Sequence, residues 1–190
     1  MAVATEDLLS DKKGFVGPTF SFANRVRRMA WQLCWLLLAR WTPPPMHRWR
    51  IAVLNAFGAN VDPNAYVYPD VKIWAPWHLR MERHATLGPG VTVYNIASTS
   101  LGAKAVVSQQ ANLCTGTHDH RDPAFPLYAL PIHVGARAWV CAQAFVGPGV
   151  TVGDGAVLAA CGVAFSHLEP WTVYRGNPAQ AHSQRAPIHE

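Results

Sequence analysis

The stretch that decides the fold is residues 132–163, which read IHVGARAWVCAQAFVGPGVTVGDGAVLAACGV. A large aliphatic residue recurs at every sixth position, at Val134, Val140, Val146, Val152 and Leu158. Four places after each of them stand Ala138, Ala144, Val150, Ala156 and Gly162, most of which are small. A period of six matches neither an α-helix nor a plain strand. It is typical of a parallel β-helix, in which three hexapeptides form one triangular coil.

The same register extends back to residue 61. Further inward positions are Val61, Val67, Ile73, Met81, Leu87, Val93, Leu101, Val107 and Leu113, and Ala164 closes the series. The pattern predicts an all-β fold of about five stacked coils, because one coil cannot bury its apolar side alone. The alternative, an antiparallel β-sandwich, does not explain a register held over about 100 residues.

The register breaks at three places. The step between inward residues is eight from Ile73 to Met81 and from Val93 to Leu101, and 21 residues separate Leu113 from Val134. Most of the last break, from His118, reads HDHRDPAFPLYALPIH. Its prolines and aspartates predict an ordered loop over residues 119–133 that leaves the prism. Loops on a rigid scaffold commonly carry function.

Composition predicts one folded unit in a reducing compartment. The chain has 190 residues, of which half are apolar and 14% are charged. The four cysteines, Cys34, Cys114, Cys141 and Cys161, form no CxxC pair, so we expect free thiols. The acidic start MAVATED does not resemble a signal peptide. We therefore expect a cytoplasmic protein.

The charge is unevenly distributed along the chain. Residues 1–60 hold eight Lys or Arg against three Asp or Glu, and residues 61–190 hold eight of each, so the whole excess of +5 lies before the β-helix. A nucleic-acid-binding protein would carry a basic stripe on its main domain. We therefore expect no nucleic-acid partner.

The domain boundaries follow from the change in pattern. Residues 1–58 are predicted as a tail and a helical segment, 59–180 as the β-helix, and 181–190 as a C-terminal tail. Ser21 suits the N-cap of a helix running to about Trp41, and a second helix is expected over residues 46–57, before Gly58. The apolar run 29–39 is too short to span a bilayer, which needs about 20 residues.

The helical segment has two interpretations. Its Trp and Leu side chains pack on the end of the prism or on a neighbouring subunit, since natural proteins cover open sheet edges. Alternatively, its apolar face and arginines give residues 21–57 a peripheral contact at the inner face of the membrane.

Several residues in or near the loop are candidates for chemistry. His118 lies next to the small corner residue Thr117 and is a candidate general base. Asn95 is placed to orient an acceptor hydroxyl, with a turn residue as the alternative. Asp119, with its neighbours His120 and Asp122, gives either a metal pair or turn caps beside a solvated histidine.

Trp139 points outward in a repeat that favours small residues there, which indicates an apolar wall for a long ligand or a subunit contact. No GxGxxG, P-loop or nucleophile-elbow pattern is present.

With the hexads and His118 in place, the chain resembles the hexapeptide-repeat acyltransferases. The resemblance is to the colanic acid (exopolysaccharide) biosynthesis acetyltransferases in particular, relatives of maltose and galactoside acetyltransferase, and covers roughly residues 20–180. It rests on the blocks NRVRR (24–28), IWAPW (73–77), LCTGTHDH (113–120), DPAFPL (122–127), AWVCAQAFVGPGVTVG (138–153) and PWTVYRGNPA (170–179).

The resemblance implies a left-handed β-helix, a homotrimer, and an acetyl-CoA site in the groove between neighbouring prisms. It implies that His118 is the base that deprotonates a sugar hydroxyl, and that a backbone N–H near Cys141 and Ala142 holds the oxyanion. It also implies that Trp139 lies near the coenzyme, with Ala142 and Ala160 along its pantetheine arm. Asp119 is expected to contact the acceptor.

Two residues depart from the family pattern. Asn95 stands where the sugar acetyltransferases carry an acceptor-contacting Asp, and Gln180 stands where a Lys or Arg commonly follows Asn-Pro-Ala. Arg175 or Arg185 is expected to replace the lost contact to the coenzyme phosphates.

Two other functions are compatible with a hexapeptide prism. One is a non-catalytic scaffold, which would bind no acetyl-CoA. The other is a γ-type carbonic anhydrase, which needs three histidines from different coils at one zinc. The irregular spacing of His78, His84, His118 and His133 argues against it, and we expect no metal.

Overall fold

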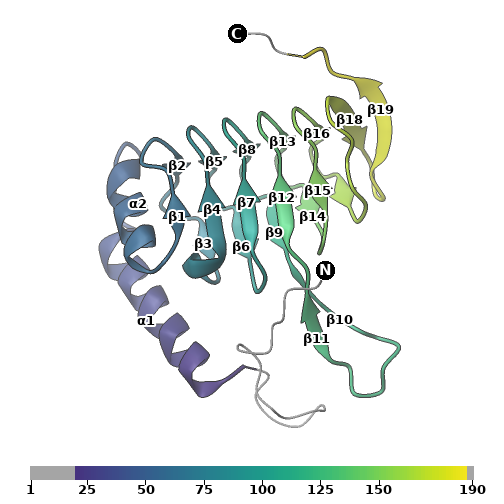
Figure 1. Cartoon of the computed structure of the whole chain (residues 1–190). Coiled ribbons are helices and arrows are strands. Elements are labelled where there is room, and N and C mark those ends of the chain that lie inside the picture. Colours follow the sequence, from purple (N-terminus) through teal and green to yellow (C-terminus); the bar gives the residue numbers. More distant parts are fainter. Residues whose placement is uncertain (1–19, 188–190) are drawn as a thin grey trace.

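The computed structural model describes residues 20–187 and has the predicted parallel β-helix (Figure 1). Short strands follow one another around a triangular prism, and equivalent strands of successive coils pair in parallel. This gives a first sheet of order β1-β4-β7-β12-β15, a second of order β19-β18-β16-β13-β8-β5-β2 and a third of order β17-β14-β9-β6-β3. Helices α1 (Phe22–Leu38) and α2 (His47–Ala56) precede the prism.

The strands are short because each side of a coil is one hexapeptide. The first sheet contains β1 (Asn60–Val61), β4 (Leu79–Met81), β7 (Thr99–Leu101), β12 (Ile132–Val134) and β15 (Thr151–Val152). The second contains β2 (Tyr66–Val67), β5 (Thr86–Leu87), β8 (Val106–Val107), β13 (Trp139–Val140), β16 (Val157–Leu158), β18 (Thr172–Arg175) and β19 (Gln180–Gln184). The third contains β3 (Lys72–Ile73), β6 (Thr92–Tyr94), β9 (Asn112–Cys114), β14 (Phe145–Val146) and β17 (Val163–Ala164).

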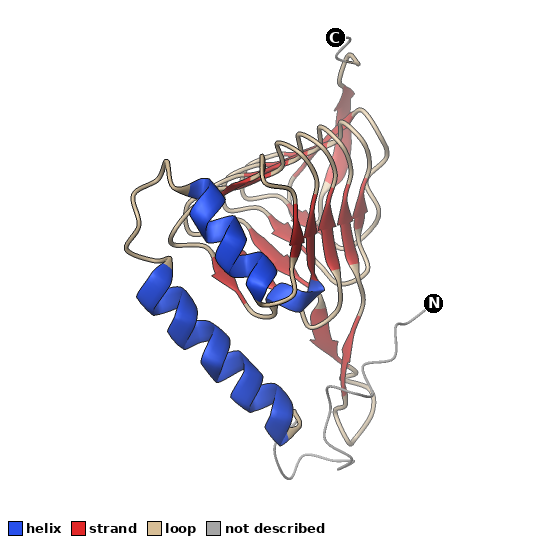
Figure 2. Ribbon diagram, turned by 60° about the vertical axis from the view of Figure 1, so that its left-hand side comes forward, coloured by secondary structure: helices blue, strands red, loops and turns tan. Residues whose placement is uncertain are grey.

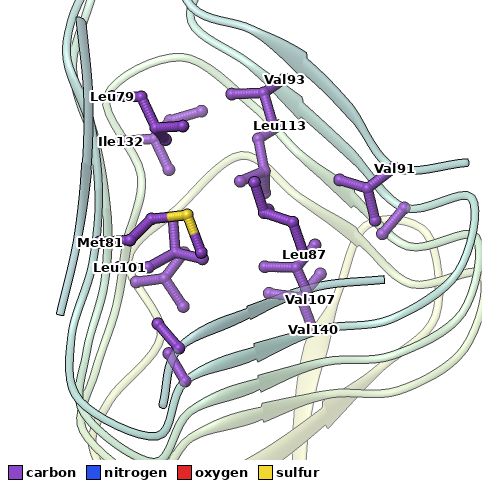
Figure 3. Close-up of a cluster of buried hydrophobic side chains, with 14 of the residues drawn as sticks. Leu79, Met81, Leu87, Val91, Val93, Leu101, Val107, Leu113, Ile132 and Val140 are labelled. Atoms are coloured by element: carbon purple, nitrogen blue, oxygen red, sulfur yellow. The ribbon is translucent and has the colours of Figure 1, made fainter. Parts of the chain in front are cut away.

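The prism interior confirms the hexad register. All fifteen predicted inward side chains are buried, and Ile73 is the most exposed of them at 7%. Figure 3 shows the result for the middle coils, where Leu87, Val107 and Val140 lie in one column and Met81 and Leu101 in another. Equivalent side chains therefore stack along the prism axis.

The structure has about six turns, one more than predicted. Five turns carry a strand in every sheet, and a partial sixth consists of Leu168, which bridges to Val152, and of β18, which pairs with β16. Its second inward side chain is Tyr174, 9% exposed, in place of an aliphatic residue. The aromatic residue and the short step from Ala164 to Leu168 hid this turn in the hexad pattern.

The regular corners share one backbone conformation. Three places after an inward residue the chain adopts a positive φ of 56–62°, at His84, Lys104, Gln110, Arg137, Gln143 and Cys161. Gly155 holds the same place with φ +64°, and a Cβ there would lie 2.4 Å from the Trp171 ring. This position therefore requires glycine twice over, for its dihedral and for the close approach.

The helices close the open end of the prism, as the first interpretation predicted. Their side chains hydrogen-bond the backbone of each inward residue of the first coil: Trp31 Nε1 donates to Ile73 O (2.8 Å), Arg50 Nε to Val67 O (2.7 Å), and the Asn55 amide bonds Val61 N and O (3.0 and 2.9 Å). One strand edge in each of the three sheets is thereby satisfied.

The first helix begins where the sequence indicated and ends slightly earlier. Ser21 is the N-cap, its Oγ accepting from Asn24 N at 3.2 Å, and α1 ends at Leu38 rather than near Trp41. The predicted C-terminal tail is partly wrong, because residues 180–184 form β19, an antiparallel partner of β18. The ordered loop that was expected contains strand structure, because β11 (Leu127–Ala129) pairs with β10 (Gly116–His118) as a hairpin.

Replacement of Trp31 tests the role of the helices as an end cap. Trp31→Phe keeps a buried ring but leaves the Ile73 carbonyl without a donor, which costs about 1–3 kcal/mol of unfolding free energy. Trp35→Phe is the matched control, because Trp35 is also buried and donates no indole hydrogen bond within residues 20–187. Chemical denaturation should show the larger loss for Trp31→Phe, and equal losses would contradict the capping role.

Candidate active site

The three edges of the prism organise the site. Each coil passes from the first sheet to the second and then to the third, so we name the first edge (first to second sheet), the second edge (second to third) and the third edge (third to first). All three breaks in the hexad register leave at the third edge. They contain the 3₁₀ helix η1 (Pro76–His78), residues 95–98, and the β10–β11 hairpin.

The insertions at the third edge support one another. Thr115 Oγ1 accepts from Ala97 N at 3.1 Å and donates to Tyr94 O at 3.0 Å. A small apolar cluster separate from the prism core fills the space between them, made of Ile96, Ala97, Ala129, Phe20, Trp74, Tyr94 and Leu127. The base of the hairpin is therefore packed against the other insertions, and its tip projects away from the prism (Figure 1).

His118 ends β10 and is exposed on the hairpin. Its Nδ1 lies 2.9 Å from the Phe125 carbonyl oxygen, and its ring stacks on the Phe125 ring with centroids 4.4 Å apart at 13°. A carbonyl only accepts, so this contact assigns the proton to Nδ1 and leaves the Nε2 lone pair available. The stacking fixes the ring plane.

The acidic residues of the hairpin cap turns. Asp119 Oδ1 accepts from Arg121 N at 2.9 Å, and Asp122 Oδ1 accepts from Ala124 N at 2.8 Å. His120 is exposed. This matches the turn-cap alternative, and within residues 20–187 no group of three His, Cys, Asp or Glu side chains is arranged to hold a metal ion.

Asn95 does not have the predicted acceptor-contacting geometry. The residue is fully buried, its Oδ1 accepts from Ala75 N at 2.9 Å, and its Nδ2 donates to Ala75 O at 2.7 Å. Both polar ends of the amide are thus occupied by the first insertion. We correct its role to positioning the third-edge insertions, because the amide is bonded at both ends and closed to solvent, so its second N–H is out of reach of a ligand.

The predicted coenzyme residues lie along the second edge or on the second sheet beside it. Trp139 is 45% exposed on β13, and its Nε1 donates to Ser108 Oγ at 2.8 Å, which fixes the indole against the sheet. Ala142 and Ala160 occupy equivalent corners of adjacent coils, with Cys161 N donating to Ala142 O at 3.0 Å. The second edge thus carries a row of small side chains parallel to the prism axis. We call this row, Ala142 and Ala160, the second-edge lane.

Cys141 and Ala142 differ in their backbone N–H groups. Cys141 N donates to Leu158 O at 2.9 Å, so it belongs to the ladder between coils. The Ala142 N–H has no hydrogen-bond partner within residues 20–187 and is the candidate oxyanion donor of the pair. Burial raises the pKa of the Cys141 thiol, which favours its neutral form.

The structure distinguishes the two arginines proposed for the coenzyme phosphates. Arg185 Nη1 donates to Arg137 O (3.0 Å) and Gly155 O (2.9 Å) at the first edge, so it fastens the C-terminal strand. Arg175 is exposed at the end of the second-edge lane. It lines a hollow with Gly176, Asn177 and Pro178 of the β18–β19 turn and with Gln180, Ala181 and His182 of β19. The geometry therefore favours Arg175.

One chain does not bring these two groups of residues together. His118 and Asp119 leave the prism at the third edge, whereas Trp139, Ala142, Ala160 and Arg175 lie at or beside the second edge, across the third sheet. A site that uses both therefore needs the third edge of one chain beside the second edge of another.

Solved structures with the same architecture define the fold class. The hexapeptide-repeat-containing acetyltransferase of Vibrio cholerae, solved with acetyl-CoA, superposes with a TM-score of 0.78 at 19% identity over 96% of this chain and 98% of that one. A maltose O-acetyltransferase from Clostridium difficile gives 0.78 at 17% identity over 88% and 90%. The fold is that of the hexapeptide-repeat acetyltransferases.

Sequence similarity narrows this class. The protein named "Putative colanic acid biosynthesis acetyltransferase WcaF" of Escherichia coli is 38% identical over 172 residues, 90% of this chain and 94% of that protein. The chain therefore belongs to the hexapeptide-repeat acetyltransferase family, in the group that includes WcaF. A scan against protein-family models gave no match.

Sequence reasoning missed Phe125 and Ser108, which orient His118 and Trp139. A phenylalanine between two prolines in a polar loop was a usable signal for Phe125. Nothing in the hexad pattern distinguished Ser108, because it precedes a corner like any other polar residue.

A carboxylate at position 95 tests the corrected role of Asn95. Asn95→Asp places an acceptor against the Ala75 carbonyl in a buried site, so we expect a loss of about 1–3 kcal/mol in unfolding free energy near neutral pH. Burial raises the pKa of such a carboxyl, and the folded state then binds the proton more tightly than the unfolded chain. The loss should shrink at acidic pH, where the protonated carboxyl donates to Ala75 O.

Urea denaturation at two pH values measures this effect, with the exposed Asn60→Asp as the control. A stability change no larger than that of the control would show that the Asn95 amide is dispensable for the third edge.

Proposed function

We propose that this acetyltransferase moves an acetyl group from acetyl-CoA to a hydroxyl of a saccharide in surface exopolysaccharide biosynthesis. The observation that carries the proposal is the contact from His118 Nδ1 to the Phe125 carbonyl, since it leaves Nε2 as a proton acceptor on an exposed, oriented ring. The name of WcaF, a colanic acid biosynthesis acetyltransferase, supports the class of product. The Vibrio cholerae structure with acetyl-CoA supports the donor.

In the proposed reaction, His118 Nε2 takes the proton of the acceptor hydroxyl while its oxygen attacks the thioester carbonyl. The carbonyl oxygen becomes an oxyanion, to which the Ala142 N–H donates. Collapse of this intermediate forms the ester and breaks the C–S bond. His118 then gives the proton to the departing CoA thiolate. The products are the acetylated saccharide and CoA, and His118 returns to its starting state. A positioned base of this kind contributes about 10²–10⁴-fold to the rate.

The second-edge lane is the proposed binding surface for the donor. Ala142 and Ala160 leave room for an extended pantetheine arm, the half-exposed Trp139 ring offers an apolar wall beside it, and Arg175 lies toward the phosphates. Cys141 contributes through its place in the coil ladder, because its thiol is buried.

We further propose a homotrimer in which the third edge of one prism faces the second edge of its neighbour. The separation of the two groups of residues on one chain supports this arrangement.

Acetyl-CoA and activated sugars are cytoplasmic metabolites, so we propose a cytoplasmic enzyme, with a lipid-linked saccharide as acceptor if the helices contact the membrane. The second carboxylate oxygen of Asp119 is the proposed acceptor contact.

Replacement of His118 tests the base. His118→Ala should lower turnover by at least about 10²-fold while acetyl-CoA binding is retained, since the side chain acts on the acceptor. His120→Ala, exposed in the same hairpin, is the control. Thiol release with a panel of sugar acceptors measures turnover, and a loss below tenfold would remove His118 as the base.

Replacement of Trp139 tests the donor site separately. Trp139→Ala should weaken acetyl-CoA binding, measured by calorimetry, by about tenfold or more because an apolar wall is lost. Tyr66→Ala, which also removes an exposed aromatic side chain from the second sheet but in the first coil, should bind normally. If the unmodified protein bound no acetyl-CoA at millimolar concentration, the scaffold alternative would replace the proposal.

A further inference from the structure

Helix α1 has two apolar faces, and only one of them packs on the prism. Trp31 and Trp35 are buried against the first coil. The opposite face carries a stripe at helical spacing whose members are 47–74% exposed: Phe22, Val26, Met29, Leu33, Leu36 and Leu37. Figure 2 shows this helix on the outside of the molecule, beyond α2 and the prism. The end-capping role therefore leaves the outer stripe unused.

Exposed apolar side chains are concentrated in this region. Ten of the large hydrophobic residues that are exposed lie within residues 22–49, and six are scattered over the rest of the described chain. Single exposed apolar residues need no explanation, but a contiguous patch marks an interaction surface. Trp41 (71% exposed) and Trp49 (46%) extend the patch beyond the C-terminus of α1.

The indole N–H groups of these two tryptophans are already satisfied. Trp41 Nε1 donates to Leu37 O at 2.6 Å, and Trp49 Nε1 donates to Leu38 O at 2.7 Å. These carbonyls belong to the last turn of the helix, where no further helical N–H reaches them. Both rings can therefore leave water without stranding a donor, and the helix end loses no hydrogen-bond partner.

The charge around the patch has one sign. Residues 20–60 contain six arginines and no Asp or Glu. Arg25, Arg40 and Arg48 are exposed, at the start of α1, at its end and on α2. Arg27 and Arg28 lie over the Trp77 and Trp74 rings, and Arg50 is buried. Cations flanking an apolar stripe complement an anionic lipid surface.

We infer that the outer face of α1, together with Trp41 and Trp49, binds in the plane of an anionic lipid membrane. The helix has 17 residues, and no helix within residues 20–187 is long and apolar enough to cross a bilayer. The stripe enters the boundary between headgroups and acyl chains, with the arginines at headgroup level. This binding is independent of the proposed acetyl transfer, but it would hold the hairpin near a membrane-anchored acceptor.

Vesicle co-sedimentation of the full chain tests the inference. The protein should bind vesicles of phosphatidylcholine mixed with phosphatidylglycerol, and bind vesicles of phosphatidylcholine alone more weakly. Leu33→Glu and Leu37→Glu each place a carboxylate in the stripe and should weaken binding at least about tenfold. Phe165→Glu is the matched control, because it makes the same change at a side chain that is 65% exposed outside the patch.

The competing occupant of the patch is a second copy of this chain. In that case Leu33→Glu would reduce the oligomer mass measured by light scattering, and the unmodified protein would not bind vesicles, which would overturn the inference. Equal vesicle binding by Leu33→Glu and Phe165→Glu would overturn it as well. Leu33→Glu should bind acetyl-CoA normally, because Leu33 lies on α1 and outside the second and third edges, so failure of membrane binding is distinguishable from failure of the proposed reaction.

Discussion

The hydrogen-bond ladder between successive coils is the constraint on which this structure depends. Each coil donates to both of its neighbours, as in the bonds from His84 N to Asn64 O of the preceding coil and from Thr86 N to Ala105 O of the following coil. The ladder fixes the register, so the inward side chains must stack in columns and every corner must turn alike. It also leaves unpaired backbone at both ends, which α1, α2 and the β18–β19 hairpin cover.

The candidate catalytic groups lie where the chain leaves this ladder. Each insertion at the third edge is hydrogen-bonded to the coil before it, Asn95 to Ala75 and Thr115 to Tyr94. The hairpin consequently inherits its orientation from the scaffold. His118 needs only one further contact, with Phe125, to fix its ring and its tautomer.

The sequence was sufficient for the prism because a six-residue period has one structural solution, and all fifteen inward residues are buried as predicted. It was less informative where the period ends. Tyr174 concealed the sixth turn, and β19 looked like a tail because none of its residues is buried. Asn95 was misjudged because its amide bonds to a residue 20 positions away, which no local pattern reveals. The proposed roles of His118, Trp139 and Arg175 rest on family resemblance and on an arrangement of two chains, because one chain places His118 on a different edge from the other two residues.

The placement of His118 and Trp139 on different edges of one prism has a genetic consequence in the proposed trimer. Catalytic activity then depends on the junction between two chains rather than on either chain alone. A ring that mixes subunits defective at the third edge with subunits defective at the second edge always contains one junction made of two intact edges. Two inactive alleles expressed together would therefore complement each other, which alleles damaging the same edge could not do.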